Sequence, residues 1–487
     1  MRREYLLAVA LSAAGCAVGP DFQRPDPPPI DKYLAGAPPA QTVEAGGTSQ
    51  VFDAQRALQP DWWRLFGSDS LDALIARGLE QSPSLEAAEA TLRASEYELR
   101  AGYGIFFPQV SGGVSADREQ YNPLRVGVAG PSSTFNLFTV SASVSYALDI
   151  YGGQRRAVEK LGAETEAQRY ALIGARIMLA SNLANGAIAA AGYRAQLAAT
   201  EELLASENEQ LKVTQVQAQS GTQPYANVLS MQSLIASTEA SLPALQQKID
   251  QSTHLLATLS GQAPSQWTGT APRLEELVLP HDLPLSVPSE LVRQRPDILS
   301  AEAALHASSA NIGVATAAMF PSLTLNAGYG VNNTALGTLF SGQSAFWSLG
   351  AGLAGPLFDG GTLWFQRKAA IESYRQSAAN YRETVLSAFE QVADDLRALE
   401  HDAQGLEAQT RAVSAAEEAL RLVQVGYQSG ISTYLQVLTA DEQLQQARIA
   451  AIQLQAQRLQ DTVALYAALG GGWWNAPAAS AAQGKPR

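Results

Sequence analysis

Cysteine is almost absent from this sequence: its 487 residues include one, Cys16. A single cysteine cannot close an intrachain disulfide, and it excludes a cysteine metal cluster. Histidine is also scarce, and no two histidines have the spacing of a ligand pair, so no metal site is expected. The four positions are His254, His281, His306 and His401. Runs of Lys and Arg are missing too, and with a formal net charge of -13 the chain is a poor partner for nucleic acid.

The apolar run near the N-terminus, residues 5–14, is too short to span a bilayer. It follows Arg2 and Arg3 and ends in small residues before Cys16, which is typical of an export signal. The end of the run resembles the lipobox of bacterial lipoproteins, in which the cysteine is acylated and becomes the first residue. Several acyl chains would anchor the chain stably to a membrane. The alternative is an ordinary signal peptide with an incidental cysteine.

Signatures of enzymatic chemistry are also missing. Residues 350–355 spell Gly-Ala-Gly-Leu-Ala-Gly, but a dinucleotide site needs a helix directly after this pattern, and Pro356 follows instead. Acidic doublets such as Glu201-Glu202 cannot face each other across a site on a helix. No Ser or Cys nucleophile has a recognisable base nearby in sequence. We therefore predict no catalytic residue, no cofactor and no metal, and we predict that the chain is not an enzyme.

The sequence does contain an internal duplication. Residues 83–108 align without a gap onto residues 296–321, an offset of 213 (321 minus 108), and further matches follow at offsets of 208 and 209. A repeat of this kind predicts that each half builds the same unit. The predicted segments are a signal peptide (1–15), a lipid-anchored N-terminal tether (16–60), a first repeat (61–270), a second repeat (271–473) and a disordered tail (474–487).

Each half contains a long Ala/Gln/Leu/Glu-rich stretch with apolar residues seven apart, which is typical of coiled-coil helices. In the first half these positions are Leu183, Ala190, Leu197, Leu204 and Leu211, with the same spacing on a return segment from Val228 to Leu256. Adding 209 maps Leu183 to Val392 and Leu211 to Leu420. Each half therefore predicts a two-helix hairpin, and residues 154–220 as one helix would be about 100 Å long. Alone, such helices would equally suit a structural rod.

Strand patterns separate the helical segments. Apolar and small polar residues alternate over residues 140–149 and 322–329, and more weakly over 109–116 and 345–353, giving four strands with one apolar and one polar face. A transmembrane barrel needs such faces, but four strands cannot close one, and an open edge cannot sit in lipid. Closure must come from several chains. Two copies would make eight strands filled by side chains, and three would make twelve with a pore.

Six motifs in order resemble the outer-membrane factors of the TolC superfamily, and in detail the OprM/NodT branch of lipoprotein efflux channels. They span residues 16–473: Cys16-Ala-Val-Gly-Pro-Asp-Phe-Gln-Arg-Pro25, Asp61-Trp62-Trp63 with Phe66, Arg295-Pro-Asp-Ile298 with Ala301-Glu302, Asn311-Ile-Gly313, Met319-Phe-Pro321 and Ala468-Leu-Gly-Gly-Gly-Trp473.

The resemblance implies a mixed α and β membrane protein: a homotrimer with a twelve-stranded transmembrane barrel, four strands per chain, continued by a long periplasmic α-helical barrel. It implies a lipid-anchored protein in the outer membrane of a Gram-negative bacterium. Family members dock onto a periplasmic membrane-fusion adaptor and an inner-membrane transporter of the resistance-nodulation-division class, and they passively conduct small molecules outward. The same architecture serving type I protein secretion is the closest rival, and a structural periplasmic coiled-coil protein is another.

The two hairpin turns should form the periplasmic tip and face the adaptor, at Gly221-Thr222 and Gly430-Ile431. In the family, the second hairpin carries the gate, with an aromatic residue that Tyr427 matches here. The family's charged gate positions correspond to Ser432, Gln436 and Thr439, which are uncharged. The nearest acids, Asp441 and Glu442, either serve the gate or form a solvated face. We predict an aperture lined by amides and hydroxyls, with weaker cation selectivity.

Overall fold

The computed structural model describes residues 17–35, 40–127 and 129–476. The predicted signal peptide 1–15, the acylation candidate Cys16 and residues 477–487 of the predicted tail lie outside the described residues. The described residues form two compact units. The first comprises those within Met1–Pro25, Leu92–Gln168 and Ala301–Tyr381, and the second comprises those within Asp26–Thr91, Arg169–Ser300 and Arg382–Arg487.

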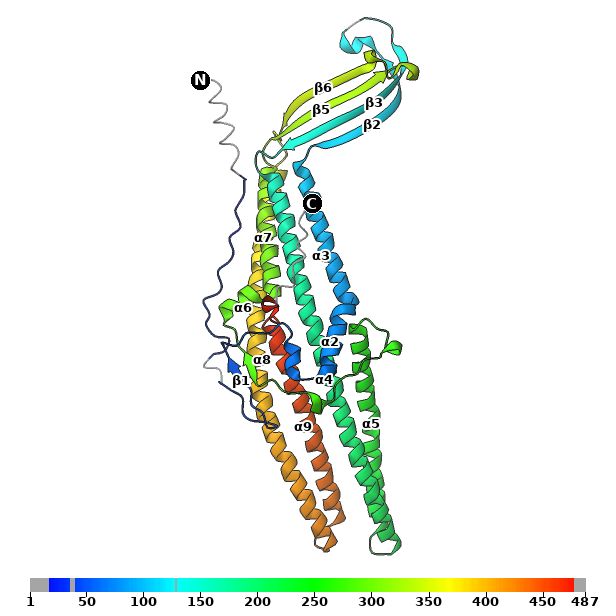
Figure 1. Ribbon diagram of the computed structural model, residues 1–487, viewed down its shortest axis with the longest axis vertical. Coiled ribbons are helices and arrows are strands. Elements are labelled where there is room, and N and C mark those ends of the chain that lie inside the picture. Colours follow the sequence, from blue (N-terminus) through cyan, green and yellow to red (C-terminus); the bar gives the residue numbers. More distant parts are fainter. Residues whose placement is uncertain (1–16, 36–39, 128, 477–487) are drawn as a thin grey trace. The chain divides into compact units, whose positions relative to one another are not determined.

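The first unit contains an antiparallel sheet of four strands in the order β2-β3-β5-β6 (Figure 1). The strands are β2 (Gln109–Tyr121), β3 (Ser133–Leu148), β5 (Ser322–Asn333) and β6 (Ala345–Ala354). Each of the four alternating segments in the sequence forms one of these strands. Because β2 and β6 end the order, each has one edge without a neighbouring strand among the described residues.

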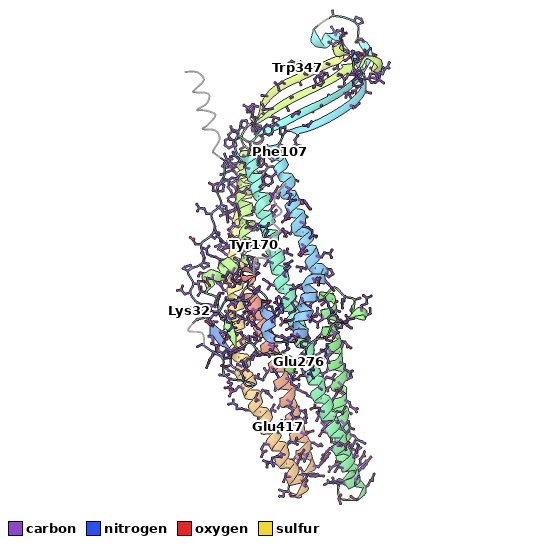
Figure 2. All side chains as sticks on the ribbon, viewed as in Figure 1. Lys32, Phe107, Tyr170, Glu276, Trp347 and Glu417 are labelled. Carbon is purple, nitrogen blue, oxygen red and sulfur yellow. The ribbon has the colours of Figure 1, made fainter. Side chains whose placement is uncertain are left out.

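The register of the sheet separates its two faces by chemistry, because residues directly opposite each other share a face. One row of paired residues consists of Val110, Val144, Ala327 and Leu349. The next row along the strands, on the other face, consists of Ser111, Ser143, Gly328 and Ser348. Aromatic side chains lie toward the strand ends: Trp347 projects from β6, and Phe107 precedes β2 (Figure 2).

Six helices of 20 or more residues hold just over half of the residues that the structure describes. Two pairs have equal lengths: α4 (Gly153–Gln219) and α8 (Thr362–Gln428) have 67 residues each, and α5 (Tyr225–Leu259) and α9 (Tyr434–Ala468) have 35 each. The shorter pair is α3 (Pro83–Gly102) and α7 (Pro296–Ala317). The hairpins α4/α5 and α8/α9 turn at Gly221 and Gly430, whose φ values of 70° and 77° favour glycine.

The heptad seams lead into the core of the second unit. Leu183 of α4 and Val392 of α8, the positions related by the duplication, are fully buried. One helix, α4, contains a stretch apolar and long enough to cross a membrane by composition. Part of α4 is accounted for by the core, since Ala187, Ile188 and Ala191 are fully buried within the second unit. These residues pack against protein rather than lipid.

The second unit also contains elements that the sequence patterns did not reveal. These are the helices α2 (Asp69–Gln81) and α6 (Pro288–Gln294) and the strands β1 (Val51–Asp53) and β4 (Asp282–Pro284). Ser68 caps α2, and the apolar face of α2 is buried at Leu71 and Ile75. The strands β1 and β4 pair in parallel although more than 200 residues separate them.

The N-terminal segment makes specific contacts in each unit. In the first unit, Asp21 accepts a 2.6 Å hydrogen bond from buried Arg156, and the ring of Phe22 stacks on His306 at 4.4 Å. In the second unit, residues 41–51 fold over α9 and surround the guanidinium of Arg458. The segment predicted as a tether is therefore held by specific contacts at several points along its described length.

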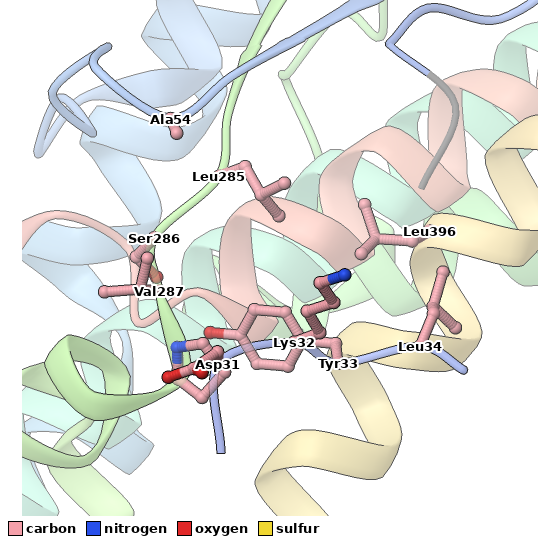
Figure 3. Close-up of a pocket in the computed structure, with 10 residues that line it drawn as sticks. Asp31, Lys32, Tyr33, Leu34, Ala54, Leu285, Ser286, Val287 and Leu396 are labelled. Carbon is pink, nitrogen blue, oxygen red and sulfur yellow. The ribbon is translucent and has the colours of Figure 1, made fainter. Parts of the chain in front are cut away.

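A small cavity lies beneath the N-terminal segment in the second unit (Figure 3). Its lining includes Tyr33 and Leu34 from that segment, Leu285 and Val287 from the stretch before α6, and Leu396 from α8. The ring of Tyr33 also meets Phe389 edge-on at 5.9 Å, and burial raises the pKa of Tyr33 to about 12. These contacts fasten the N-terminal segment to α8.

Candidate functional site

Two of the six sequence motifs meet at the C-terminal end of α9. Arg295 donates to the carbonyl oxygen of Ala468 at 2.9 Å and to Asp297 at 2.8 Å, and its Nη2 also donates to Gln391 at 2.6 Å. A cation at this position complements the partial negative charge at the end of a helix. Gly470, next along the chain after Leu469, has a φ of 91° that lets the backbone leave the helix.

Aromatic residues add further contacts where these motifs meet at the C-terminal end of α9. The indole of Trp473 donates to the carbonyl oxygen of Gln294 at 2.8 Å, so the Gly-Gly-Gly-Trp motif binds the residue beside the Arg-Pro-Asp motif. Trp62, from the Asp-Trp-Trp motif, is 1% exposed and stacks on Tyr466 of α9 at 5.4 Å. The motifs at the end of α9 build the scaffold of the second unit.

The polar face of the sheet is suited to line a water-filled passage. Along most of its length it is built mainly from serine, threonine, asparagine and glycine, and the hydroxyls of Ser111 and Ser143 lie 2.8 Å apart in a hydrogen bond. Toward the far end of β2, the same face also carries the acidic side chains of Asp117 and Glu119. The opposite face presents large apolar side chains to the surroundings, among them Val114, Trp347 and Leu349 with 76–81% exposure. In water such a face would be unfavourable, whereas in hydrocarbon it is the face that a spanning strand requires.

The turns of the two hairpins carry exposed apolar side chains. Ile431 is 84% exposed and Leu435 is 69% exposed at the α8/α9 turn, and Tyr225 is 65% exposed at the α4/α5 turn. Both turns are closed by backbone hydrogen bonds, from Thr222 to Gln217 and from Ile431 to Gly426. Fixed turns that display apolar residues are suited to bind another protein surface.

The hairpins are joined near these turns by neutral contacts. The hydroxyl of Tyr427 on α8 donates to Gln217 on α4 at 2.9 Å, and the hydroxyl of Thr214 lies 3.1 Å from that of Tyr434 on α9. The rings of Tyr427 and Tyr434 lie 5.6 Å apart. An apolar cluster of Met231, Ile235 and Tyr434, with Leu204, Leu211, Leu234, Tyr427 and Leu438 around it, fills the same region. Burial raises the pKa of Tyr427.

The uncharged residues predicted for the aperture have local roles in the helix ends. Gln436 and Thr433 form a reciprocal cap at the start of α9, in which the Gln436 amide oxygen accepts from the Thr433 backbone at 2.7 Å. The hydroxyl of Thr439 donates to the carbonyl oxygen of Leu435, and the Ser432 backbone donates to Gly426. These contacts give the aperture residues fixed positions, and their role in gating stays a prediction.

The two nearby acids differ in their surroundings. Asp441 is half-buried, and burial raises the pKa of its carboxyl group. Glu442 is exposed, and its carboxylate accepts a hydrogen bond from Gln446 at 3.2 Å. The sequence patterns did not single out Glu207 of α4, which is 2% exposed at the same end of the hairpins. Among the residues the structure describes, no cluster of three or more histidine and carboxylate side chains could hold a metal ion.

The fold and these surfaces define an outer-membrane channel. The model of the family described as outer membrane efflux protein matches residues 74–262 and 287–471, which is more than half of the chain. The chain therefore belongs to the outer membrane efflux protein family, and it is an efflux channel of the outer membrane. The predicted family, location and function are confirmed, and this family consists of channel proteins rather than enzymes.

Relatives of known name match over nearly the whole chain. The pyoverdine export outer membrane protein OpmQ of Pseudomonas aeruginosa is 31% identical over 453 residues, covering 92% of this chain and 93% of OpmQ. The cation efflux system protein CusC of Escherichia coli is 29% identical, covering 96% and 97%. The structure of the outer-membrane channel OprN superposes with a TM-score of 0.85 at 27% identity, covering 94% of this chain and 100% of OprN.

Proposed function

We propose that three copies of this chain form one channel, in which each copy contributes its four strands to a twelve-stranded barrel. The sheet carries this proposal, because it has an apolar face, a polar face and two edges without a neighbour in the described chain. Open edges leave backbone groups unpaired, which hydrocarbon does not tolerate, so β2 of one copy would pair with β6 of the next. Twelve strands would leave a pore that eight would not.

The helical hairpins would continue this pore through the periplasm as a helical barrel. The turns at Gly221-Thr222 and Gly430-Ile431 would bind a periplasmic membrane-fusion adaptor, which would connect the channel to an inner-membrane transporter of the resistance-nodulation-division class. Exposed Ile431, Leu435 and Tyr225 support this assignment, because an adaptor could cover their apolar surface. Acylation of Cys16 would anchor each copy in the lipid beside the barrel.

The channel would be a passive conduit whose cargo is chosen elsewhere in the pump. OpmQ and CusC are named for pyoverdine export and for cation efflux, two unlike cargoes, although both align with this chain over most of its length. The polar face of the sheet has mainly hydroxyl, amide and backbone groups, with the acidic side chains of Asp117 and Glu119 toward one end, which would suit many small solutes. Small molecules or ions delivered by the transporter are the proposed cargo.

Native mass spectrometry of the detergent-extracted mature protein tests the assembly and the anchor together. We expect a trimer in which each copy begins at Cys16 and carries acyl mass. A Cys16→Ser variant provides the matched control, because it should lose the acyl mass. A soluble, unacylated monomer or dimer would contradict the proposal and would favour a structural coiled-coil protein.

For the aperture, we propose a lining of Tyr427, Ser432, Gln436 and Thr439, so that polar uncharged groups rather than a ring of acids set its selectivity. Asp441→Asn should therefore change the ratio of cation to anion permeability less than about twofold in a planar bilayer, since Asp441 is half-buried. Glu442→Gln is the parallel variant for the exposed acid. Loss of cation selectivity in either variant would show that the acids govern it.

A further inference from the structure

A row of buried polar residues runs along α4 where the two hairpins pack together. Thr200, Glu207 and Thr214 are seven residues apart, and they are 3%, 2% and 1% exposed. Each threonine hydroxyl donates to the carbonyl oxygen four residues earlier at 2.8 Å, to Gln196 and Gln210 respectively. The ionisable residue in this row is therefore Glu207, and it lies between two positions whose hydrogen bonds are satisfied.

The surroundings of Glu207 suit a neutral carboxyl group better than an anion. One carboxyl oxygen accepts a 3.1 Å hydrogen bond from Thr238 on α5, and the other is buried with no hydrogen-bond partner in the described part of the chain. Leu204 and Leu211 flank it on the same helix and belong to the apolar cluster. Burying an ion without an opposite charge costs far more than burying its protonated form.

The charges near Glu207 do not neutralise it. Asp441 on α9 raises the pKa of Glu207 further, after burial as the main cause, and the bond from Thr238 only partly opposes this. Cations in the region have acidic partners of their own: Lys212 pairs with Glu209 at 2.6 Å, and Arg448 pairs with Glu417 at 2.8 Å. On α8, Arg421 pairs with Glu418 at 2.6 Å, and Glu239 on α5 and Glu442 on α9 are exposed acids.

We propose that Glu207 is a proton-operated latch between the two helical hairpins. When Glu207 is protonated, α9 packs against α4 and α5 through the apolar cluster and the tyrosine hydrogen bonds. When it loses its proton, its charge is unpaired and faces the like charge of Asp441, which weakens that packing and favours separation of the hairpins. The latch would hold at low pH and release as the pH rises, so acidity in the periplasm would keep the aperture closed.

This inference rests on the proposed channel, so its first test is conductance across a planar bilayer between about pH 5 and about pH 8. Wild-type protein should open more often as the pH rises. Glu207→Gln, which mimics the protonated form, should lose this dependence and stay at the low-pH level. Asp441→Asn should retain the dependence on pH. Its midpoint should move to lower pH by on the order of one unit, because Glu207 loses a neighbouring negative charge. Glu202→Gln, an exposed acid five residues earlier on the same helix, is the matched control and should behave as wild type.

A second measurement does not depend on conduction. Infrared difference spectra of wild type against Glu207→Gln at about pH 5, where the latch is expected to hold, should contain the band of a protonated carboxylic acid. The corresponding spectra of wild type against Glu202→Gln should not. Absence of that band, or an unchanged pH dependence of opening in Glu207→Gln, overturns the latch. A protein that carries the band but conducts at no pH would refute the proposed channel and not the protonation of Glu207. In that case, an unchanged spacing between labels at Ser220 and Ser429, at the two hairpin turns of one chain, across this pH range would refute the latch.

Discussion

Leu349→Arg is expected to abolish assembly of the channel in the outer membrane. Leu349 lies on the apolar face of β6, is 78% exposed and pairs with Ala327 in the middle of the sheet. Arginine on the lipid face of a spanning barrel costs about 2–4 kcal/mol near the bilayer midplane, and in the proposed trimer this cost would apply three times. Membrane fractionation and gel analysis of unheated samples would measure the loss of the assembled form.

The adjacent residue provides a matched control for this prediction. Ser348 lies on the polar face of the same strand, opposite Gly328, so Ser348→Arg would place its charge in the passage rather than in lipid. This variant should assemble normally and should reduce the permeability to cations. Equal loss of both variants from the outer membrane would contradict the assignment of the two faces.

Arg458→Ala is expected to destabilise the second unit by about 3–5 kcal/mol, because several buried acceptors lose their hydrogen-bond donor at about 1–3 kcal/mol each. The guanidinium is 1% exposed and donates to Gln50, to Thr42 and to the carbonyl oxygen of Ala45, each at 3.1 Å. Without it, these acceptors would be buried and without their donor. Arg458 also lies near Asp402. Burial and the neighbouring Asp461 raise the pKa of Asp402 to about 7, and the positive charge of Arg458 partly opposes this rise.

Thermal unfolding and trypsin digestion would measure this effect. In Arg458→Ala we expect a lower unfolding temperature and faster cleavage at Lys32 and Arg56, which bracket the segment that Arg458 holds. Arg448→Ala is the matched control on the same helix, because the pair between Arg448 and Glu417 is largely exposed and should contribute less than about 1 kcal/mol. If both variants lose the same stability, the network around Arg458 does not hold the N-terminal segment.

The repeating elements of this fold could be predicted because their signals are periodic. Heptad spacing predicts that Leu183 and Val392 face a core, and both are fully buried. Alternation predicts the four strands of the sheet and their two faces. In contrast, the parallel pairing of β1 with β4 joins short segments far apart in sequence, and neither segment carries a periodic pattern. The same holds for Arg458, whose partners come from a loop more than 400 residues away.

The candidate site was predictable only in part. Gln436 is expected at the aperture by resemblance, but the sequence also carries a capping box, Thr433 followed three residues later by Gln436, and the structure forms it. Glu207 resembles an ordinary solvated glutamate, since Glu201, Glu202 and Glu209 lie nearby on the same helix. Its burial depends on how α5 and α9 pack around α4, and the one local signal is its spacing of seven from Thr200 and Thr214.

The two free edges of the sheet have a genetic consequence. If β2 of each copy must pair with β6 of another, a copy with one damaged edge can still join the ring through its intact edge. The ring that contains this copy then cannot close. In a cell that makes equal amounts of intact and damaged chains, about one trimer in eight would contain three intact copies if the copies assemble at random. Mutations at these edges would then be dominant, whereas mutations that prevent folding of the whole chain would be recessive.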